Sequence, residues 1–171
     1  MAPKNIIEFL LRTLKVMIAS TIIALLPVQD VAMAGWMLQR TVASQANEAR
    51  CYLKSDVMIL NDGYQDIKAF MGIHLDRLLV NTGSPLDTSF SDIGLQVDKN
   101  DFILMDSVSS RQAALFTESY AQLIEQFKKG RSVRVQLRFW PTWPTTGTHS
   151  VSFSLIGFSK AYSQMQSCSE S

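Results

Sequence analysis

Two segments near the C-terminus alternate apolar and polar residues so strictly that they constrain the fold class. Residues 132–139 place an apolar side chain at every second position, and residues 151–156 repeat the pattern after a turn. A period of two is that of a β-strand with one buried and one solvated face. Two such strands need a second layer to cover their apolar side. We therefore expect a two-layer β structure, with the second layer supplied by residues 36–106.

The segment 117–129, which precedes the first of these strands, predicts one amphipathic helix. Its apolar residues recur at helical spacing, and Lys128 and Lys129 complement its carbonyl end. We expect Thr117 to be the N-cap residue and Gly130 to be the C′ residue. The predicted buried face consists of Tyr120, Leu123, Ile124 and Phe127.

Short strand-forming segments separated by turn signals fill the earlier part of the chain. Asp62-Gly63 predicts a tight hairpin, because glycine readily supplies the positive φ that such a turn needs. Residues 54–56 predict a kink within a strand-forming run, and residues 81–91 predict a loop that crosses between sheets. Residues 107–116 are expected to be a loop, and residues 159–165 a short closing helix. The spacing predicts an antiparallel β-sandwich of seven or eight short strands.

Residues 1–34 have the three parts of a secretory signal peptide. A basic start is followed by the uncharged run 16–26, which Pro27 ends. Residues 32–34 (Ala-Met-Ala) then place small side chains at the two positions that a signal peptidase reads, so we expect cleavage before Gly35. The basic residues are Lys4, Arg12 and Lys15.

The alternative for this segment is an uncleaved membrane anchor. Its uncharged run would span about 16 Å as a helix, at about 1.5 Å per residue, whereas a bilayer core is about 30 Å thick. We therefore expect a signal peptide over residues 1–34 and a single β-sandwich domain over residues 35–171. The cleaved chain is expected to be periplasmic or secreted, with no membrane span.

The charge balance argues against nucleic acid as a partner. The chain has 16 basic and 15 acidic residues, a formal net charge of +1. Loss of residues 1–34 removes three of the basic and two of the acidic side chains, so that 13 of each remain. A formally neutral protein has no long-range field to attract a polyanion.

Cys51 and Cys168 are the only cysteines in the sequence. In an oxidising compartment we expect them to form one disulfide that ties the C-terminus to an early strand. The alternative is two unpaired thiols, with Cys51 buried and Cys168 in a polar tail. The pair cannot by itself form a structural zinc site, which needs four ligands.

The sequence contains no recognisable catalytic motif. His74 and His149 are its two histidines, and neither accompanies a Gly-x-Ser-x-Gly elbow. We interpret both as strand or surface residues, and the carboxylates at turns as solvated. No phosphate-binding glycine loop or nucleotide fingerprint occurs. We expect no catalytic residue, metal or cofactor. The carboxylate pairs at turns are Asp62 with Asp66 and Asp98 with Asp101.

The turn between the two alternating segments is the most unusual local feature. Trp140 and Trp143 lie in a proline-containing turn, close to Arg134 and Arg138 on the polar face of the preceding strand. The arginines could form a glycan or nucleic-acid surface, but a solvated sheet face suits the neutral charge better. The tryptophans either cap the core or form an exposed partner-binding tip.

An ordered series of short motifs within residues 120–162 resembles the C-terminal half of the invasion-associated locus B family of secreted bacterial proteins. In that family a helix ending in Lys-Gly precedes one strand, and a strand ending in Ser-Leu-x-Gly-Phe precedes a short closing helix. The cysteines common before the family's helix are absent from residues 107–116. The resemblance implies a periplasmic or extracellular β-sandwich, tied in some members to host-cell invasion, with no established catalytic residue. The matching residues are Leu123, Ile124, Phe127, Lys129, Gly130, Val133–Phe139, Val151–Phe158 and Ala161.

Three functional hypotheses follow. The first is an exported non-enzymatic protein that binds a protein or cell-envelope partner. The second is an envelope hydrolase that uses aspartate and histidine residues, and the third is a component of a secretion or surface apparatus. The candidate partner-binding residues are Arg134, Arg138, Trp140, Trp143 and His149.

Overall fold

The computed structural model describes residues 35–42, 49–141 and 147–169, which contain eleven strands and two helices. The strands are β1 (Trp36–Val42), β2 (Ala49–Ser55), β3 (Met58–Asn61), β4 (Asp66–Ile73), β5 (Leu78–Thr82), β6 (Gly94–Val97), β7 (Ile103–Leu104), β8 (Ser107–Ser109), β9 (Ala113–Phe116), β10 (Ser132–Leu137) and β11 (His149–Ser154). The helices are α2 (Tyr120–Lys129) and α3 (Phe158–Ser169).

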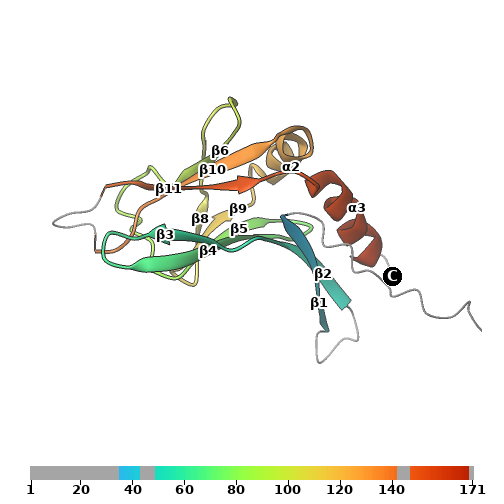
Figure 1. The fold of residues 1–171 in the computed structure, drawn as a ribbon, viewed down its shortest axis with the longest axis horizontal. Coiled ribbons are helices and arrows are strands. Elements are labelled where there is room, and N and C mark those ends of the chain that lie inside the picture. Colours follow the sequence, from blue (N-terminus) through green and yellow to red (C-terminus); the bar gives the residue numbers. More distant parts are fainter. Residues whose placement is uncertain (1–34, 43–48, 142–146, 170–171) are drawn as a thin grey trace, which may run out of the picture. The chain divides into compact units, whose positions relative to one another are not determined.

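The described strands form two antiparallel sheets that face one another as separate layers (Figure 1). The larger sheet has seven strands in the order β1-β2-β4-β5-β9-β8, with β3 paired to β4. The smaller has four strands in the order β11-β10-β6-β7. The predicted antiparallel β-sandwich with one amphipathic helix and a C-terminal helix is confirmed. The expected loop over residues 81–91 crosses from one sheet toward the other, because β5 and β6 belong to different sheets.

The alternating segments form neighbouring strands, as their period predicted. β10 pairs with β11 in antiparallel register, from Ser132 opposite Ser154 to Leu137 opposite His149. The residues expected to face inward are buried and those between them are more exposed. The buried members are Val133, Val135, Leu137, Val151 and Phe153.

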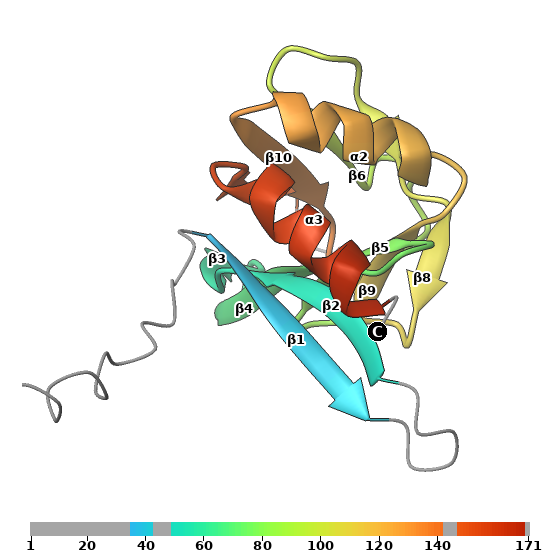
Figure 2. The ribbon, with the colours of Figure 1, turned by 90° about the vertical axis from the view of Figure 1, so that its right-hand side faces the viewer.

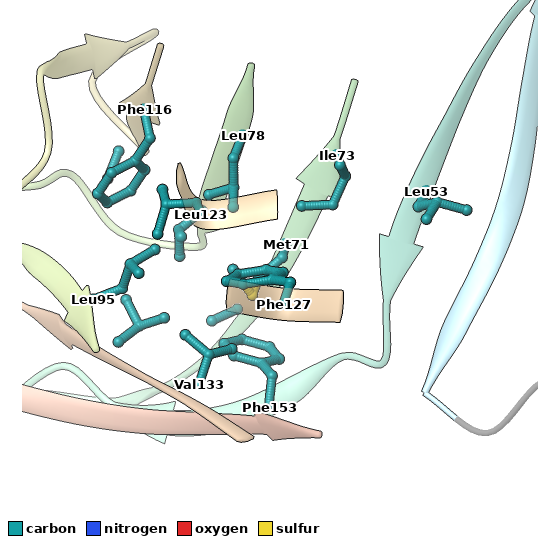
Figure 3. Packing of buried hydrophobic residues seen from close by; sticks show 14 of the residues in the cluster. Leu53, Met71, Ile73, Leu78, Leu95, Phe116, Leu123, Phe127, Val133 and Phe153 are labelled. Atoms are coloured by element: carbon teal, nitrogen blue, oxygen red, sulfur yellow. The ribbon is translucent and has the colours of Figure 1, made fainter. Parts of the chain in front are cut away.

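Helix α2 closes the space between the two sheets with its apolar face. Leu123 and Phe127 are fully buried and Ile124 is nearly so. Figure 3 shows Leu123 and Phe127 among residues of both sheets, including Met71 from β4 and Phe153 from β11. Three members of the predicted face are therefore buried, and the fourth, Tyr120, is half-buried against the same core.

Helix α3 extends from Phe158 to Ser169 and so exceeds the expected 159–165. It lies across the strand pair β1–β2 (Figure 2). Trp36, at the start of β1, is 2% exposed and contacts Phe158 and Phe127 at ring-centroid distances of 5.0 and 6.4 Å. Its indole Nε1 donates to the carbonyl of Ser154 at 3.0 Å. The first strand and the last helix are thus locked together by aromatic packing.

The predicted kink after Lys54 separates β2 from β3. Lys54 pairs with Gly72, and Met58 pairs with Ala69. Between these two pairs the chain advances by four residues from β2 to β3 but by only three along β4, so β2–β3 has one extra residue. This is the count of a β-bulge. The hydroxyl of Ser55 satisfies the displaced backbone, because it accepts a hydrogen bond from the Met71 amide at 2.8 Å.

Two expectations around α2 are wrong. Residues 107–116 are not a loop but the hairpin β8–β9, whose turn places Ser110 and Arg111 at positive φ. Thr117 is not the N-cap residue, since α2 begins at Tyr120. Instead Thr117 donates from its amide and its hydroxyl to the carboxylate of Asp106, which accepts the Glu118 amide as well.

The expectation of seven or eight strands was too low because several ladders are very short. β7 has two residues and β8 has three. Such ladders leave little alternation in the sequence from which to detect a strand.

Candidate functional site

An exposed tryptophan lies at the turn that follows β10, and an exposed tyrosine from another hairpin is bonded to the same turn. Trp140 is 57% exposed and Tyr64, from the β3–β4 hairpin, is 56% exposed. The Tyr64 hydroxyl donates to the carbonyl of Pro141 at 3.4 Å, and the Trp140 amide donates to the carbonyl of Pro85 at 2.9 Å. The backbone of Trp140 and Pro141 is therefore held by two other segments of the chain. We name Tyr64, Phe90, Arg138 and Trp140 the aromatic end.

Arg138 is held by neighbouring side chains rather than projecting into solvent. Its side chain is 14% exposed and forms a bidentate ion pair with Asp92, with Nε 3.1 Å from each carboxylate oxygen. The guanidinium lies over the Phe90 ring, 4.2 Å from its centroid. The bonds from Asp92 raise the pKa of Arg138 above its ordinary value. Arg138 thus positions Phe90, which is itself 44% exposed.

Arg134 lies two residues before Gln136 on the same outer face of the smaller sheet, and its side chain is exposed. Its guanidinium donates to the side-chain oxygen of Gln96 at 3.1 Å. The Gln136 amide donates to the carbonyl of Asp92 at 2.8 Å. This face is polar and internally hydrogen-bonded, which agrees with the interpretation of a solvated sheet face.

His149 lies at the start of β11, opposite the buried Leu137, and is half-buried rather than exposed. Its ring lies 5.5 Å from the ring of Phe139, and its Nε2 atom is buried without a hydrogen-bond partner among the described residues. Trp143 lies outside the described residues. Of the five candidate residues, the structure exposes Trp140 and Arg134.

A buried polar group beneath the aromatic end includes Asp62 and Ser84. They are 4% and 5% exposed, and the Ser84 hydroxyl donates to Asp62 Oδ2 at 2.5 Å. Asp62 Oδ1 accepts the amides of Tyr64 and Gln65 within the hairpin turn. Burial opposes ionisation, but these hydrogen bonds and the nearby His149 together lower the pKa of Asp62 below its ordinary value. The arrangement fixes the predicted Asp62-Gly63 turn, in which Gly63 has a φ of 102°.

His74 lies in a second environment on the larger sheet. Its ring stacks on Tyr52 at 5.1 Å, and its carbonyl accepts a hydrogen bond from the Tyr120 hydroxyl. Burial and the charge of Arg77 lower the pKa of His74, against the opposing effect of Asp76. Within the described ranges, no three His, Cys, Asp or Glu residues are grouped as metal ligands.

The predicted disulfide between Cys51 and Cys168 is present. It joins β2 to the last turn of α3, across a sequence separation of 117 residues. Arg40 of β1 lies beside it, with Nη2 3.5 Å from Cys168 Sγ. Helices α2 and α3, the two in the described part of the chain, are too short and too polar to cross a membrane.

Comparison with known proteins adds one similarity, at the level of fold. No protein-family model matches the chain, and no curated protein sequence matches it. Among solved structures, the crystal structure of invasion associated protein B from Bartonella henselae matches with a TM-score of 0.55. The chain resembles that protein in fold. The match covers 81% of this chain and 95% of the other at 14% identity, so it extends well beyond the motifs of residues 120–162.

Sequence reasoning missed Tyr64 and Phe90 of the aromatic end, and Asp92, which pairs with Arg138. Each lies more than 40 residues from the β10 turn in sequence, so no local pattern connects them. The exposure of Tyr64 could have been predicted from its position, because an aromatic side chain directly after an Asp-Gly turn has no neighbouring apolar strand face to join.

Proposed function

We propose that this chain is an exported, non-enzymatic binding protein whose partner, a protein or another cell-envelope component, docks on the aromatic end. The observation that carries the proposal is the 57% exposure of Trp140 on a backbone that is held in place by Pro85. Tryptophan and tyrosine side chains give large contact areas at little entropic cost, and they are enriched where proteins bind partners. Tyr64 and Phe90 add further exposed aromatic area.

Export is part of the same proposal. The signal-peptide pattern of residues 1–34 and the single domain expected over residues 35–171 support it. The Cys51–Cys168 disulfide suits an oxidising compartment such as the periplasm or the extracellular medium. The fold similarity to invasion associated protein B from Bartonella henselae is consistent with this assignment.

The hydrolase hypothesis is less well supported. It would need the grouping of Asp62, Ser84 and His149, in which a hydroxyl lies beside a carboxylate near an imidazole. Asp62 and Ser84 are almost completely buried, and the Ser84 proton is donated directly to Asp62. A serine nucleophile instead needs an imidazole as its base and an open approach for the substrate.

Site-specific photo-crosslinking in the native host tests the proposal. A photoreactive phenylalanine analogue replaces Trp140 in one variant and Leu75, 49% exposed and remote in sequence, in the control. We expect a discrete adduct from position 140 that weakens when Tyr64→Ala is added. Equal adducts from both positions, or none from position 140, would contradict docking at the aromatic end.

A further inference from the structure

An open cleft of about 770 Å³ lies between β1 and α3, apart from the residues of the aromatic end. Its floor contains Leu38 and Arg40 of β1, and its wall contains Lys160, Ser163 and Gln164 of α3. The strand register explains why these two β1 side chains face α3. Leu38 and Arg40 lie opposite Leu53 and Cys51, so they share the sheet face that α3 covers. Helix α3 covers the β2 side of this face more closely, which leaves Leu38 39% exposed (Figure 2).

The disulfide joins the two sides of this cleft. Cys51 is the direct cross-strand partner of Arg40, and Cys168 is itself a lining residue. The bond therefore fixes the end of α3 over the strand pair and sets the separation of floor and wall. Such a cleft is largely formed before a ligand arrives, which lowers the entropic cost of binding.

The charged side chains that line this cleft are all positive. Arg40 and Lys160 are its charged lining residues, and both are exposed. The ion pairs of the described residues do not involve either of them, whereas Lys128, Lys129 and Arg138 all have carboxylate partners. Among the described residues, two cations line this cleft and no carboxylate does, which favours an anionic ligand.

The position of β1 favours an extended peptide over a small anion. Among the described strands, β1 is the last at one edge of the larger sheet, and an edge strand can accept another strand through its main chain. Alternate side chains of an added strand would then project to the face that carries Arg40. The lining runs along α3 from Lys160 to Cys168, about 12 Å at about 1.5 Å per residue, which is enough to contact several residues of a peptide. A small anion is usually bound by donors that converge on one point.

We propose that this cleft binds an acidic segment of a partner protein, added in extended form beside β1, with Arg40 and Lys160 pairing with its carboxylates. The inference concerns a second surface and does not depend on docking at the aromatic end.

Binding of a fluorescent decapeptide of alternating glutamate and threonine to the purified protein tests the inference. We expect Arg40→Gln with Lys160→Gln to weaken binding by about tenfold, the scale of two partly exposed ion pairs. The matched control, Lys68→Gln with Lys99→Gln, removes the same charge from exposed positions outside the cleft and should leave binding unchanged. A peptide with glutamine in place of glutamate should not bind.

A charge-reversed double variant distinguishes loss of binding from loss of folding, because an unfolded variant could not gain a new specificity. Arg40→Glu with Lys160→Glu should bind a lysine–threonine decapeptide that the wild-type protein does not bind. The inference fails if the wild-type protein does not bind the glutamate peptide, or if both glutamine double variants weaken binding equally. It also fails if millimolar inorganic phosphate displaces the peptide, which would indicate a site for a small anion. It fails likewise if phosphatidylglycerol vesicles, and not the peptide, bind in a manner that depends on Arg40 and Lys160.

Discussion

Gly130 connects α2 to β10 with a φ of −82°, so it is not needed for a left-handed conformation. A Cβ atom here would lie 2.6 Å from Val97 Cγ1 and 2.9 Å from the carbonyl oxygen of Gln126. The residue is therefore required for space. We expected Gly130 to end the helix as a C′ residue, a position that favours a left-handed backbone. The helix does end there, but a side chain is excluded by tertiary contacts and not by backbone strain.

We expect Gly130→Ala to destabilise the protein by about 1–3 kcal/mol, the usual cost of inserting a methyl group into a packed site. Urea denaturation measures the change. Gly147→Ala is the control, because a Cβ there meets nothing within 4 Å, and it should change the stability by less than about 0.5 kcal/mol. Equal effects of the two substitutions would show that the close approach at Gly130 does not matter.

Asp62 makes part of the stability depend on pH. Burial opposes its ionisation, but hydrogen bonds from Ser84, Gln65 and Tyr64 lower its pKa in the folded protein. A carboxyl with a lowered folded pKa stabilises the protein above its unfolded pKa of about 3.9, and the contribution disappears as the pH falls through the folded value. Asp62→Asn lacks this contribution. The stability difference between wild type and variant, from urea midpoints between pH 7 and pH 3, should therefore narrow as the pH falls. A difference that stays constant or grows would contradict this assignment.

At the scale of elements, α3 is attached to the sheets by aromatic packing at one end and by the disulfide at the other. Phe158 contacts Trp36, and Cys168 is bonded to Cys51. A crosslink across 117 residues stabilises by at most about 4–5 kcal/mol in the chain-entropy model.

We expect Cys51→Ser with Cys168→Ser to lose up to that amount of stability. Hydrogen exchange should show the last turns of α3 losing protection while β10 keeps its own, because only the former depend on the crosslink. Reduction of the wild-type protein is the control and should give the same pattern. Uniform loss of protection in both elements would show that the disulfide does not act locally.

Among elements, those with a long regular period could be predicted from the sequence, and those held by distant partners could not. The buried face of α2 and the alternation of β10 and β11 are local properties. The hairpin β8–β9 is short and contains Ala113 and Ala114, which are weak strand signals. The amides of Thr117 and Glu118, just before α2, are satisfied by Asp106, which lies 11 residues before Thr117. A local capping rule selects a neighbouring side chain and so chose Thr117.

At the scale of the whole molecule, the proposed export makes a prediction about mass. Expression with the native leader should yield a chain that begins at Gly35, shorter by residues 1–34. Intact-mass spectrometry of the exported protein checks this, and reduction should add the mass of two hydrogen atoms, for the single disulfide. Replacement of Ala34 by a large residue such as arginine should block processing. An exported chain that keeps the leader, or starts elsewhere, would contradict the proposed boundary.

The candidate site was only partly predictable for the same physical reason as the fold. Trp140 stands out in the sequence because it departs from the alternation, and Arg138 occupies a regular polar position two residues before it. Their partners Tyr64, Phe90 and Asp92 reach them only through the packing of separate loops, and that packing decides that Arg138 is held while Trp140 is exposed.

The burial of Trp36 has a consequence for the order of maturation. Its indole lies in the core, and the carbonyl of Gly35 accepts the Asp56 amide at 3.0 Å. A signal peptidase that cuts before Gly35 needs an extended, accessible substrate at this point, which the docked first strand would not offer. Under the proposed export, cleavage would therefore precede the final docking of β1, and the protein would complete its fold only on the far side of the membrane.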